Sequence, residues 1–577
     1  MTCRAAALSP SPGEAILTEV HGRKRVELTT ATLVTIGIVI AVFALILVGT
    51  TKAARAGEAG PEATPTAGVT ADSSASPDIQ PAVGSLTDVR NVVMILADDL
   101  DWAAFDQVPR LAALKSAGTT LSNFVVTDSL CCPSRTSFMR SQYVHNHRVI
   151  SNIKATGGGW ETFYKRGLAD DCLPTWLQKS GVNTSLIGKY LNGFPNGTPT
   201  PAYIPPGYDY FVTSTSKNQA YQGFDYTLNE NGTLKTYGRK PADFMNSVLV
   251  KNAGAYLKTA KSPFFMEFAS YNPHTPAPFD AKYANSHTVD VIPRTPSFNT
   301  AGTNELGWLA DRYVLTPKRV ANLDRLWQKR LRSTESIADT YEVIRAQLQA
   351  TGHADDTLII VTSDNGYHAG VHRLATGKQT AYKEDAVVPT IFIGPGIAKG
   401  AVISQMTSMV DLGPTISSIF GAKTPSYVDG RNLAPLLRGE TQTPWRTAVL
   451  TENLARTTPD DPDYSPEVVP PFHAVRSENW LYVEYRNGDV ELYDLKTDPY
   501  EMNNVQASTN PAIVAQLHAQ LTALKRCKGA TCRIADSMPN GTSILQLPQV
   551  TAAPTVSPSA SVSATPLPSG SVTSPVQ

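Results

Sequence analysis

The sequence predicts an α/β fold: a large, mostly parallel sheet flanked by helices, with a smaller antiparallel-sheet subdomain near the C-terminus. Short, nearly continuous apolar runs occur at residues 91–97, 184–187, 264–269 and 356–363. Such runs are typical of parallel strands that are buried on both faces. Long helical patterns intervene, for instance at 324–350. Strand–helix alternation of this kind predicts a parallel sheet covered by helices.

The pattern changes after about residue 422. Residues 480–485 and 490–494 alternate between apolar and polar side chains, and the turn Arg486-Asn487-Gly488-Asp489 separates them. Asn-Gly between two alternating runs is a strong hairpin signal. We therefore expect a main domain over residues 88–422 and a C-terminal antiparallel subdomain over 423–535.

The N-terminal region predicts export and membrane anchoring. Residues 1–30 are polar and include Arg23-Lys24-Arg25, and an apolar run without charge follows at 31–49. A run of about 18 such residues is long enough to span a bilayer, and the basic cluster keeps residues 1–30 in the cytoplasm. The alternative is a signal peptide cleaved near Ala56, which would release a secreted protein. Segments 50–87 and 536–577, rich in Pro, Ala, Ser and Thr, predict a disordered linker and tail.

Charge and cysteine content narrow the function classes. Fifty Lys and Arg residues balance fifty Asp and Glu residues, which argues against a nucleic-acid partner. Cys527 and Cys532 are close in sequence and predict a small disulfide loop. Cys172 is a candidate disulfide partner for Cys132, and this pairing would leave Cys131 as the odd thiol of the exported part.

Hard oxygen ligands follow two of the predicted strands. Asp98 and Asp99 come after the run 91–97, and Asp364 and Asn365 come after the run 356–363. Open α/β sheets place their sites at the carboxyl ends of strands, and carboxylate and amide oxygens suit Ca²⁺ or Mg²⁺. The alternative is a pair of solvated turns, because Asp-Asn-Gly is also a common turn sequence.

A second cluster of reactive types lies at Cys131-Cys132-Pro133-Ser134-Arg135. Proline suits the first turn of a helix, so we expect a helix from Pro133 or Ser134 with Cys131 just before its N-terminus. Arg135 could bind an anion there. The alternative is two buried or disulfide-bonded cysteines before an ordinary helix. Further candidate anion binders are Lys189, His274 and Lys378.

These motifs resemble those of the sulfatase family over about residues 90–505. Cys131-x-Pro133-x-Arg135 is similar to the sulfatase signature, and the other family motifs follow in the same order: Gly188-Lys189-Tyr190, Pro273-His274-Thr275-Pro276 and Ser363-Asp364-Asn365-Gly366. The paired cysteines, with His145-Asn146-His147 downstream, are similar to N-acetylglucosamine-6-sulfatases and the related heparan endosulfatases.

The resemblance implies an alkaline-phosphatase-like sulfatase fold and a mechanism. A formylglycine-generating enzyme would oxidise Cys131 to formylglycine, whose hydrate attacks the sulfate ester of a sulfated carbohydrate. Family likeness favours Ca²⁺ over Mg²⁺, held by Asp98, Asp99, residue 131, Asp364 and Asn365. Arg135, Lys189 and Lys378 would stabilise charge on the sulfate, and His274 or Lys378 would protonate the leaving alcohol.

Two departures from the family pattern stand out. Many sulfatases have a histidine where this chain has Leu191, so the base must come from elsewhere, with His145, His147 and His368 as candidates; His368 is also a candidate substrate ligand. Arg140-Ser141 replaces the usual Thr-Gly that assists conversion of the cysteine. The alternatives are a phosphate or phosphonate ester hydrolase of the same superfamily, or a glycan-binding protein without activity if Cys131 stays a thiol.

Overall fold

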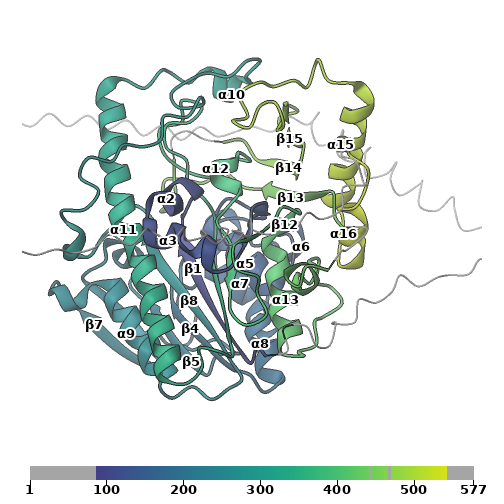
Figure 1. Ribbon diagram of the computed structural model, residues 1–577. Helices are drawn as coiled ribbons and strands as arrows, with labels where there is room; N and C mark the ends of the chain where they lie inside the picture. The colour runs from purple at the N-terminus through teal and green to yellow at the C-terminus, as the bar shows by residue number, and fades with distance from the viewer. Residues whose placement is uncertain (1–85, 87, 441–444, 466–468, 542–577) are drawn as a thin grey trace, which may run out of the picture. The chain divides into compact units, whose positions relative to one another are not determined.

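A computed structural model describes residues 86, 88–440, 445–465 and 469–541 (Figure 1). The predicted anchor at 31–49, the linker apart from Leu86, and the tail beyond Gly541 lie outside these residues, so they remain predictions. Within the described ranges, no helix combines the length and the apolar character needed to cross a membrane.

The predicted large sheet is present and has ten strands. In spatial order they are β11 (Ala401–Ile403), β2 (Thr119–Leu121), β10 (Ile391–Ile393), β9 (Thr357–Ser363), β1 (Asn91–Asp98), β8 (Phe264–Pro273), β4 (Asn183–Gly188), β5 (Tyr210–Ser214), β6 (Tyr226–Glu230) and β7 (Thr233–Tyr237). The centre, from β9 to β5, is parallel. Antiparallel pairs occur toward both edges.

Strand β1 shows why the apolar runs predict buried strands. Alternate side chains point to opposite faces of a sheet. Val92, Met94 and Leu96 belong to one hydrophobic core, whereas Val93 and Ile95 belong to the other. Both faces are therefore covered, and a continuous apolar sequence is required.

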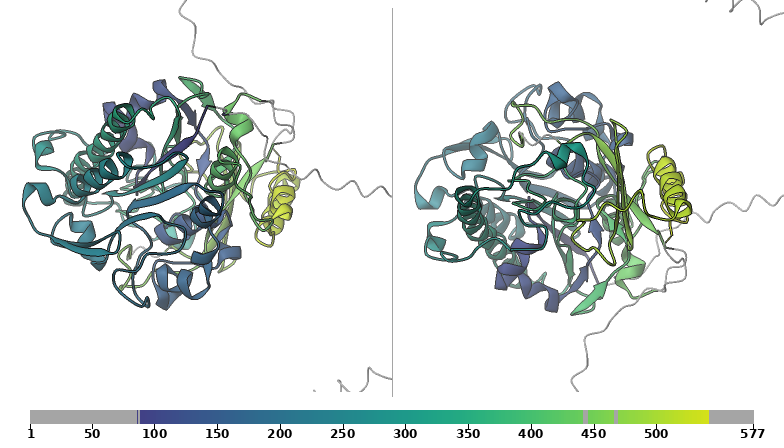
Figure 2. Two further views of the ribbon diagram at one scale, coloured as in Figure 1. Left: turned by 90° about the horizontal axis from the view of Figure 1, so that it is seen from below. Right: turned by 90° about the horizontal axis from the view of Figure 1, so that it is seen from above.

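Helices supply these two layers (Figures 1 and 2). One face is covered by α5 (Cys131–Arg140), α7 (Gly159–Lys165), α8 (Leu173–Lys179) and α13 (Leu412–Ile419). The other face is covered by α2 (Trp102–Gln107), α3 (Pro109–Ala112), α4 (Leu114–Ala117), α9 (Met245–Leu257) and the 34-residue α11 (Pro317–Ala350). Shorter helices are α6 (Val144–His147), α10 (Gly307–Ala310), α12 (Lys383–Ala386) and α14 (Ala434–Leu437).

The predicted C-terminal unit is a four-stranded antiparallel sheet in the order β13 (Ala448–Asn453), β14 (Phe472–Ser477), β15 (Trp480–Tyr485) and β16 (Val490–Asp494). The hairpin expected at Asn487-Gly488 joins β15 to β16. Helix α15 (Pro511–Leu524) packs on one face. The other face packs on Leu374, Ala381 and Tyr382 of the chain after β9. This second contact fixes the segment that carries Lys378.

Two small elements complete the fold. Strands β3 (Phe124–Val125) and β12 (Thr407–Ser408) form a parallel pair. Helix α16 (Ala530–Ala535) follows α15, and the predicted disulfide between Cys527 and Cys532 joins the two helical segments.

Candidate active site

The predicted oxygen ligands meet at the carboxyl ends of β1 and β9. The two strands are paired in register up to Ala97 and Ser363, so the residues that follow lie side by side. Asp99 has a φ of 68°, a left-handed conformation that Asp tolerates better than most residues. Its backbone N–H donates to Asp364 Oδ1 at 3.2 Å, and Asn365 Nδ2 donates to Asp99 Oδ1 at 2.6 Å.

Arg330 of α11 stabilises the turn at Asp99. One of its Nη atoms donates to the Asp99 carbonyl at 2.6 Å and to Asp101 Oδ2 at 2.8 Å. The side chain is fully buried, so these bonds compensate the cost of burying its charge. Nothing in the helical pattern of α11 distinguished this arginine from the others.

Helix α5 begins at Cys131, two to three residues before the predicted start at Pro133 or Ser134. Leu130 is the N-cap, and its carbonyl accepts the N–H of Ser134. Pro133 therefore falls in the first turn, where a missing N–H costs nothing. Cys131 is fully buried, and its Sγ lies 3.4 Å from Asp98 Oδ1.

Two of the predicted cations bind the neighbouring carboxylates of Asp98 and Asp99. Lys189, just after β4, donates to Asp98 Oδ2 at 2.7 Å. Lys378 donates to Asp99 Oδ1 at 2.6 Å and to Cys131 Sγ at 3.0 Å. Burial would lower the pKa of Lys189, but Asp98 outweighs it and the pKa lies well above its ordinary value. Both lysines can therefore present full positive charge beside position 131.

His274 joins this group from the end of β8. Asp98 pairs with Pro273 across the sheet, which brings the next residue, His274, toward the site. Its Nε2 lies 3.8 Å from Asp99 Oδ2, and its Nδ1 lies 2.6 Å from the carbonyl of Thr275. Burial lowers the pKa of His274, yet the nearby carboxylates, Asp99 first, raise it above its ordinary value.

Arg135, predicted as an anion binder, also contacts groups of the protein. Its Nε donates to Asp364 Oδ2 at 2.8 Å and its Nη1 to the carbonyl of Lys189 at 3.0 Å. Nε and Nη1 are thus engaged with the protein, whereas Nη2 is buried and has no hydrogen-bond partner among the described residues, so it could still donate to a substrate anion. This geometry supports a positioning role, since Arg135 ties the loop after β4 to the loop after β9.

The thiol of Cys131 is poorly suited to act as a nucleophile itself. Burial, followed by the charges of Asp463 and Asp98, raises its pKa well above the ordinary value. The thiolate is the nucleophilic form of cysteine. An unmodified Cys131 would therefore stay protonated at neutral pH.

The site fits a hard divalent cation. Among the described residues, ligand atoms of Asp98, Asp99, Cys131 and His274 lie within 4.8 Å of one another. Asp99 Oδ2 and Asn365 Oδ1 are buried and have no hydrogen-bond partner in the part of the chain that the structure describes, as expected of atoms that would face an ion. Asp364, a predicted ligand, is not in that group. Its Oδ1 accepts the N–H groups of Asp99 and Asn365, and its Oδ2 accepts Arg135.

The predicted disulfide between Cys132 and Cys172 is wrong. Both residues are free and buried. Cys132 Sγ accepts the N–H of Asn192 at 3.0 Å, whereas the thiol of Cys172 donates to the carbonyl of Ala169 at 3.4 Å. Each is engaged with its own neighbour in the hydrophobic core, and burial raises the pKa of each to about 12. The pairing was predicted from the number of cysteines, and that number says nothing about the distance between Cys132 and Cys172 in the fold.

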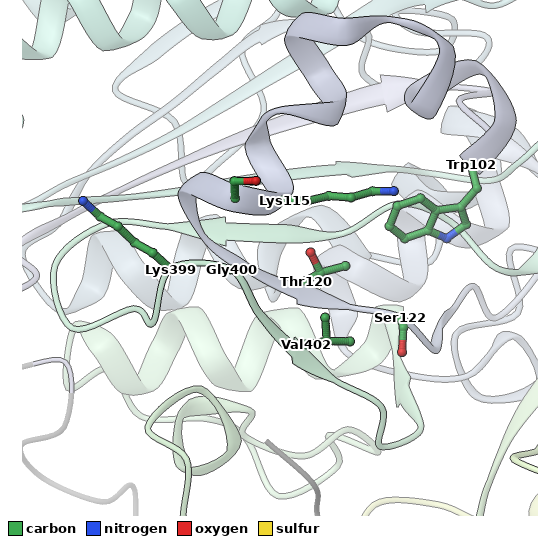
Figure 3. A pocket seen from close by; sticks show the side chains of 8 residues that line it. Trp102, Lys115, Thr120, Ser122, Lys399, Gly400 and Val402 are labelled. Atoms are coloured by element: carbon green, nitrogen blue, oxygen red, sulfur yellow. The ribbon is translucent and has the colours of Figure 1, made fainter. Parts of the chain in front are cut away.

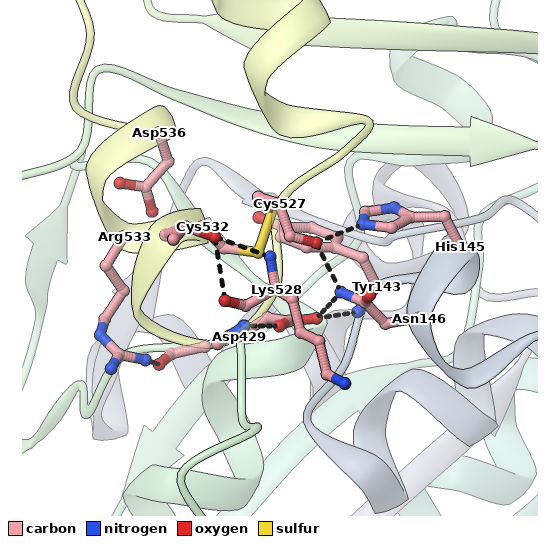
Figure 4. Close-up of a disulfide and its surroundings, with 12 residues drawn as sticks. Tyr143, His145, Asn146, Asp429, Cys527, Lys528, Cys532, Arg533 and Asp536 are labelled. Carbon is pink, nitrogen blue, oxygen red and sulfur yellow. Dashed lines mark hydrogen bonds between the residues drawn. A yellow bond between two sulfur atoms is a disulfide. The ribbon is translucent and has the colours of Figure 1, made fainter. Parts of the chain in front are cut away.

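His145, predicted as a catalytic residue, contacts groups of the C-terminal unit (Figure 4). Its Nδ1 lies 2.9 Å from Glu452 Oε2, and its Nε2 lies 2.9 Å from the carbonyl of Cys527 in the disulfide loop. Both ring nitrogens are therefore used to join α6 to the C-terminal unit. Burial would lower the pKa of His145, but Glu452 raises it to about 9.

The other two candidate bases are also engaged. His147 Nδ1 accepts the N–H of Val149 at 3.1 Å, and its Nε2 lies 2.9 Å from Ser137 Oγ. Its pKa lies well below the ordinary value because of burial. His368 Nδ1 lies 2.9 Å from Asp385 Oδ2, and its backbone pairs with Gly377. His368 therefore positions the segment that leads into Lys378.

Asp463 is a further residue of the site that the sequence analysis missed. It lies in the chain between β13 and β14, yet its side chain is 4% exposed and enters the site. Burial would raise its pKa, but Lys378 and His274 hold the pKa well below its ordinary value. The only signal was a run of acids at Asp460-Asp461-Pro462-Asp463, which also reads as a solvated loop.

A cavity opens beside Lys189. Its volume is about 280 Å³, and polar and aromatic side chains line it, among them Asn192, Ser214, Tyr221 and Tyr271. A larger cavity of about 680 Å³ lies elsewhere, between Trp102, Lys115 and Lys399, and none of the predicted site residues lines it (Figure 3). Of these two cavities, the smaller one reaches the predicted site, because Lys189 is part of its lining.

Comparison with protein families decides the class. A family model described as Sulfatase matches residues 90–422, which include every element of the site except Asp463. The chain belongs to the sulfatase family. A second model, N-sulphoglucosamine sulphohydrolase, C-terminal, matches residues 370–527 of the sulfatase. The protein is therefore a sulfuric ester hydrolase.

Relatives resemble this sulfatase over most of its length. The N-acetylglucosamine-6-sulfatases of Capra hircus and Homo sapiens are each 32% identical to it over 483 residues, which represent 77% of this chain and 84% and 86% of theirs. Putative extracellular sulfatase Sulf-1 homolog of Caenorhabditis elegans is 29% identical over 381 residues, covering 63% of this chain and 52% of its own.

Solved structures share the fold of the sulfatase. One, in complex with its substrate D-glucosamine-2-N,6-O-disulfate, has a TM-score of 0.65 at 18% identity and covers 78% of this chain and 99% of its own. A phosphonate monoester hydrolase of Agrobacterium radiobacter has a TM-score of 0.57 at 19% identity, covering 76% and 96%. The predicted fold class is confirmed.

Proposed function

We propose that this sulfatase hydrolyses the 6-O-sulfate ester of an N-acetylglucosamine-type sugar. The observation that carries the proposal is the 32% identity to N-acetylglucosamine-6-sulfatases over 77% of the chain. The match to the Sulfatase family model, over residues 90–422, includes Asp98, Asp99, Cys131, Lys189 and His274.

We propose that the sulfatase uses a divalent metal, Ca²⁺ in preference to Mg²⁺. Asp98, Asp99 and Asn365 offer hard oxygen ligands, which both ions favour. When bound, such an ion would neutralise charge and lower the pKa of a coordinated hydroxyl. Asp364 supports the ligand loop through the N–H groups of Asp99 and Asn365.

Position 131 is proposed to carry the nucleophile after conversion of Cys131 to formylglycine by a formylglycine-generating enzyme. The protonated, buried thiol argues against direct attack by sulfur. A hydrated aldehyde at this position would supply a hydroxyl nucleophile instead.

Lys189, Lys378 and His274 have separate roles in the proposed reaction. Lys189 and Lys378 flank position 131 and would stabilise negative charge that develops on the sulfate oxygens. His274, with a pKa above its ordinary value, would donate a proton to the leaving alcohol. The sugar would occupy the cavity beside Lys189, whose volume of about 280 Å³ is close to the lower limit of about 300 Å³ for small-molecule sites. That size suits one sugar unit.

The test compares sulfate release from N-acetylglucosamine 6-sulfate with release from the 3-sulfate and 4-sulfate isomers of N-acetylated hexosamines. We expect the 6-sulfate to be hydrolysed at least tenfold more efficiently by kcat/KM. An equal or better rate with another isomer would contradict the proposed substrate.

Two further measurements address the alternatives. Nitrophenyl sulfate should be turned over much faster than nitrophenyl phosphate, and the reverse order would favour a phosphate or phosphonate ester hydrolase. Mass spectrometry of the peptide that carries Cys131, from protein made in the native host, should show formylglycine. An unmodified cysteine there would favour a sulfated-glycan-binding protein without activity.

A further inference from the structure

The carboxylate of Asp463 is bound by groups assigned to the sulfate. Its Oδ1 lies 2.8 Å from His274 Nε2 and 3.1 Å from Lys378 Nζ. Its Oδ2 accepts Asn152 Nδ2 at 2.6 Å and lies 3.5 Å from Cys131 Sγ. A carboxylate of the protein itself therefore lies between His274 and Lys378 and close to Cys131, the proposed position of the nucleophile.

A sulfate group and this carboxylate cannot occupy the site together. Both need the same donors on His274 and Lys378, and both are negative. Like charges a few ångströms apart repel strongly when water is excluded, and the side chain of Asp463 is only 4% exposed. Binding of a sulfate ester therefore requires the carboxylate to leave.

The chain around Asp463 can allow such an exchange. Asp463 belongs to neither a helix nor a strand. Outside the site it is held through its N–H, which donates to Asp461 Oδ1 at 2.9 Å, and through its carbonyl, which accepts Gln379 Nε2 at 3.3 Å. The preceding Pro462 lines the cavity beside Lys189. Asp463 thus stands at the junction between the catalytic groups and that cavity.

We propose that Asp463 is a specificity-determining residue that occupies the sulfate position of the unloaded enzyme and is displaced by substrate. The proposal rests on the proposed function of the same site. Free sulfate can replace the carboxylate only through the attraction of its charge to the cationic groups. A sugar sulfate also fills the cavity and so gains contacts that offset the displacement. Asp463 therefore selects sugar esters over free sulfate and limits inhibition by the sulfate that is released.

The test measures binding of inorganic sulfate by isothermal titration calorimetry to protein with the Cys131→Ala substitution, so that no turnover is needed. Asp463→Asn keeps the size of the side chain and removes its charge. We expect the dissociation constant of sulfate to fall at least tenfold in the Asp463→Asn protein. Circular dichroism and thermal melting establish that each variant is folded, and Asp463→Ser provides a second variant without the carboxylate.

Asp460→Asn is the matched control. Asp460 is exposed and lines the same cavity. The substitution therefore removes one negative charge nearby but leaves Asp463 bound to His274 and Lys378. We expect this control to change the dissociation constant of sulfate less than twofold. A similar gain in both variants would overturn the proposal, because the effect would then be general electrostatic attraction.

Activity measurements supply the second arm. In otherwise wild-type protein, Asp463→Asn should lower the inhibition constant of inorganic sulfate at least tenfold and narrow the preference for sugar sulfates over nitrophenyl sulfate. Unchanged or weaker sulfate binding would overturn the proposal, as would a fall in kcat without any change in sulfate inhibition. The calorimetric result does not depend on which sugar is the substrate. It therefore tests the role of Asp463 even if N-acetylglucosamine 6-sulfate proves not to be hydrolysed.

Discussion

Arg135 Nε donates to Asp364 Oδ2 at 2.8 Å, and the two side chains are 2% and 0% exposed. The pair joins the first turns of α5 to the loop after β9. The nucleophile position and the candidate metal ligands therefore share one buried electrostatic support.

Removing the arginine should be costly because it leaves the Asp364 carboxylate buried without its partner. We expect Arg135→Ala to lower the free energy of unfolding by about 3–5 kcal/mol, measured by urea denaturation. The matched control is Arg239→Ala, since Arg239 pairs with Asp225 at the surface with 82% of its side chain exposed. That change should cost less than about 1 kcal/mol. Equal losses in the two variants would refute the buried support.

The role of His274 can be separated from that of the lysines. If His274 protonates the leaving alcohol, His274→Ala should reduce kcat on a sugar sulfate by about 10²–10⁴-fold. The loss on nitrophenyl sulfate should be much smaller, because nitrophenolate leaves without a proton. Steady-state kinetics with both substrates checks this. A loss of the same size on the two substrates would argue for another role of His274.

Metal binding should be visible without any assay of activity. Protein treated with chelator and dialysed should gain thermal stability on addition of Ca²⁺, by about 2.7 kcal/mol when the ion is at a hundred times its dissociation constant. Asp99→Asn should weaken the response by removing a ligand charge. A melting temperature that does not respond to Ca²⁺ or Mg²⁺ would count against the site.

The pH dependence of stability should reveal His145. Its pKa of about 9 exceeds its ordinary value, so the folded state binds the proton more tightly than the unfolded state does. The resulting stabilisation is complete below about pH 6.5 and is lost as the pH rises through about 9. We expect His145→Gln to cost about 3 kcal/mol at pH 6 and much less at pH 10.

The same variant tests whether His145 takes part in catalysis. Because the imidazole contacts Glu452 and the carbonyl of Cys527, His145→Gln should leave kcat on a sugar sulfate within twofold at a temperature where the variant is folded. A loss of activity as large as that of His274→Ala would restore His145 as a catalytic residue.

The central strands and the metal loops were predictable because their physics is local. A parallel strand covered on both faces requires an apolar run, and the polar residues at its carboxyl end, such as Asp98 and Asp364, lie at one edge of the sheet. The hairpin at Asn487-Gly488 was predictable for a similar reason, since only a few residue types fit its turn. These features need no knowledge of the rest of the chain.

Contacts between distant segments were not predictable in this way. Asp463 reaches the site only because the four-stranded sheet packs against the segment that carries Lys378. His145 lies close to Cys131 in sequence, yet the short helix α6 directs it to the disulfide loop. Cys132 and Cys172 satisfied the count of thiols, but each binds a neighbour in the core. Each error came from a distance that residue types do not encode.

The complete burial of Cys131 bears on whether this residue is oxidised before or after the chain folds. An enzyme that oxidises this side chain has to hold it in a cleft of its own, and the folded chain leaves no atom of it accessible. The proposed conversion would therefore have to precede folding, while the segment around Cys131 is still extended. Variants that fold faster or slower should then differ in the fraction of molecules that mature, even when the final structures are the same.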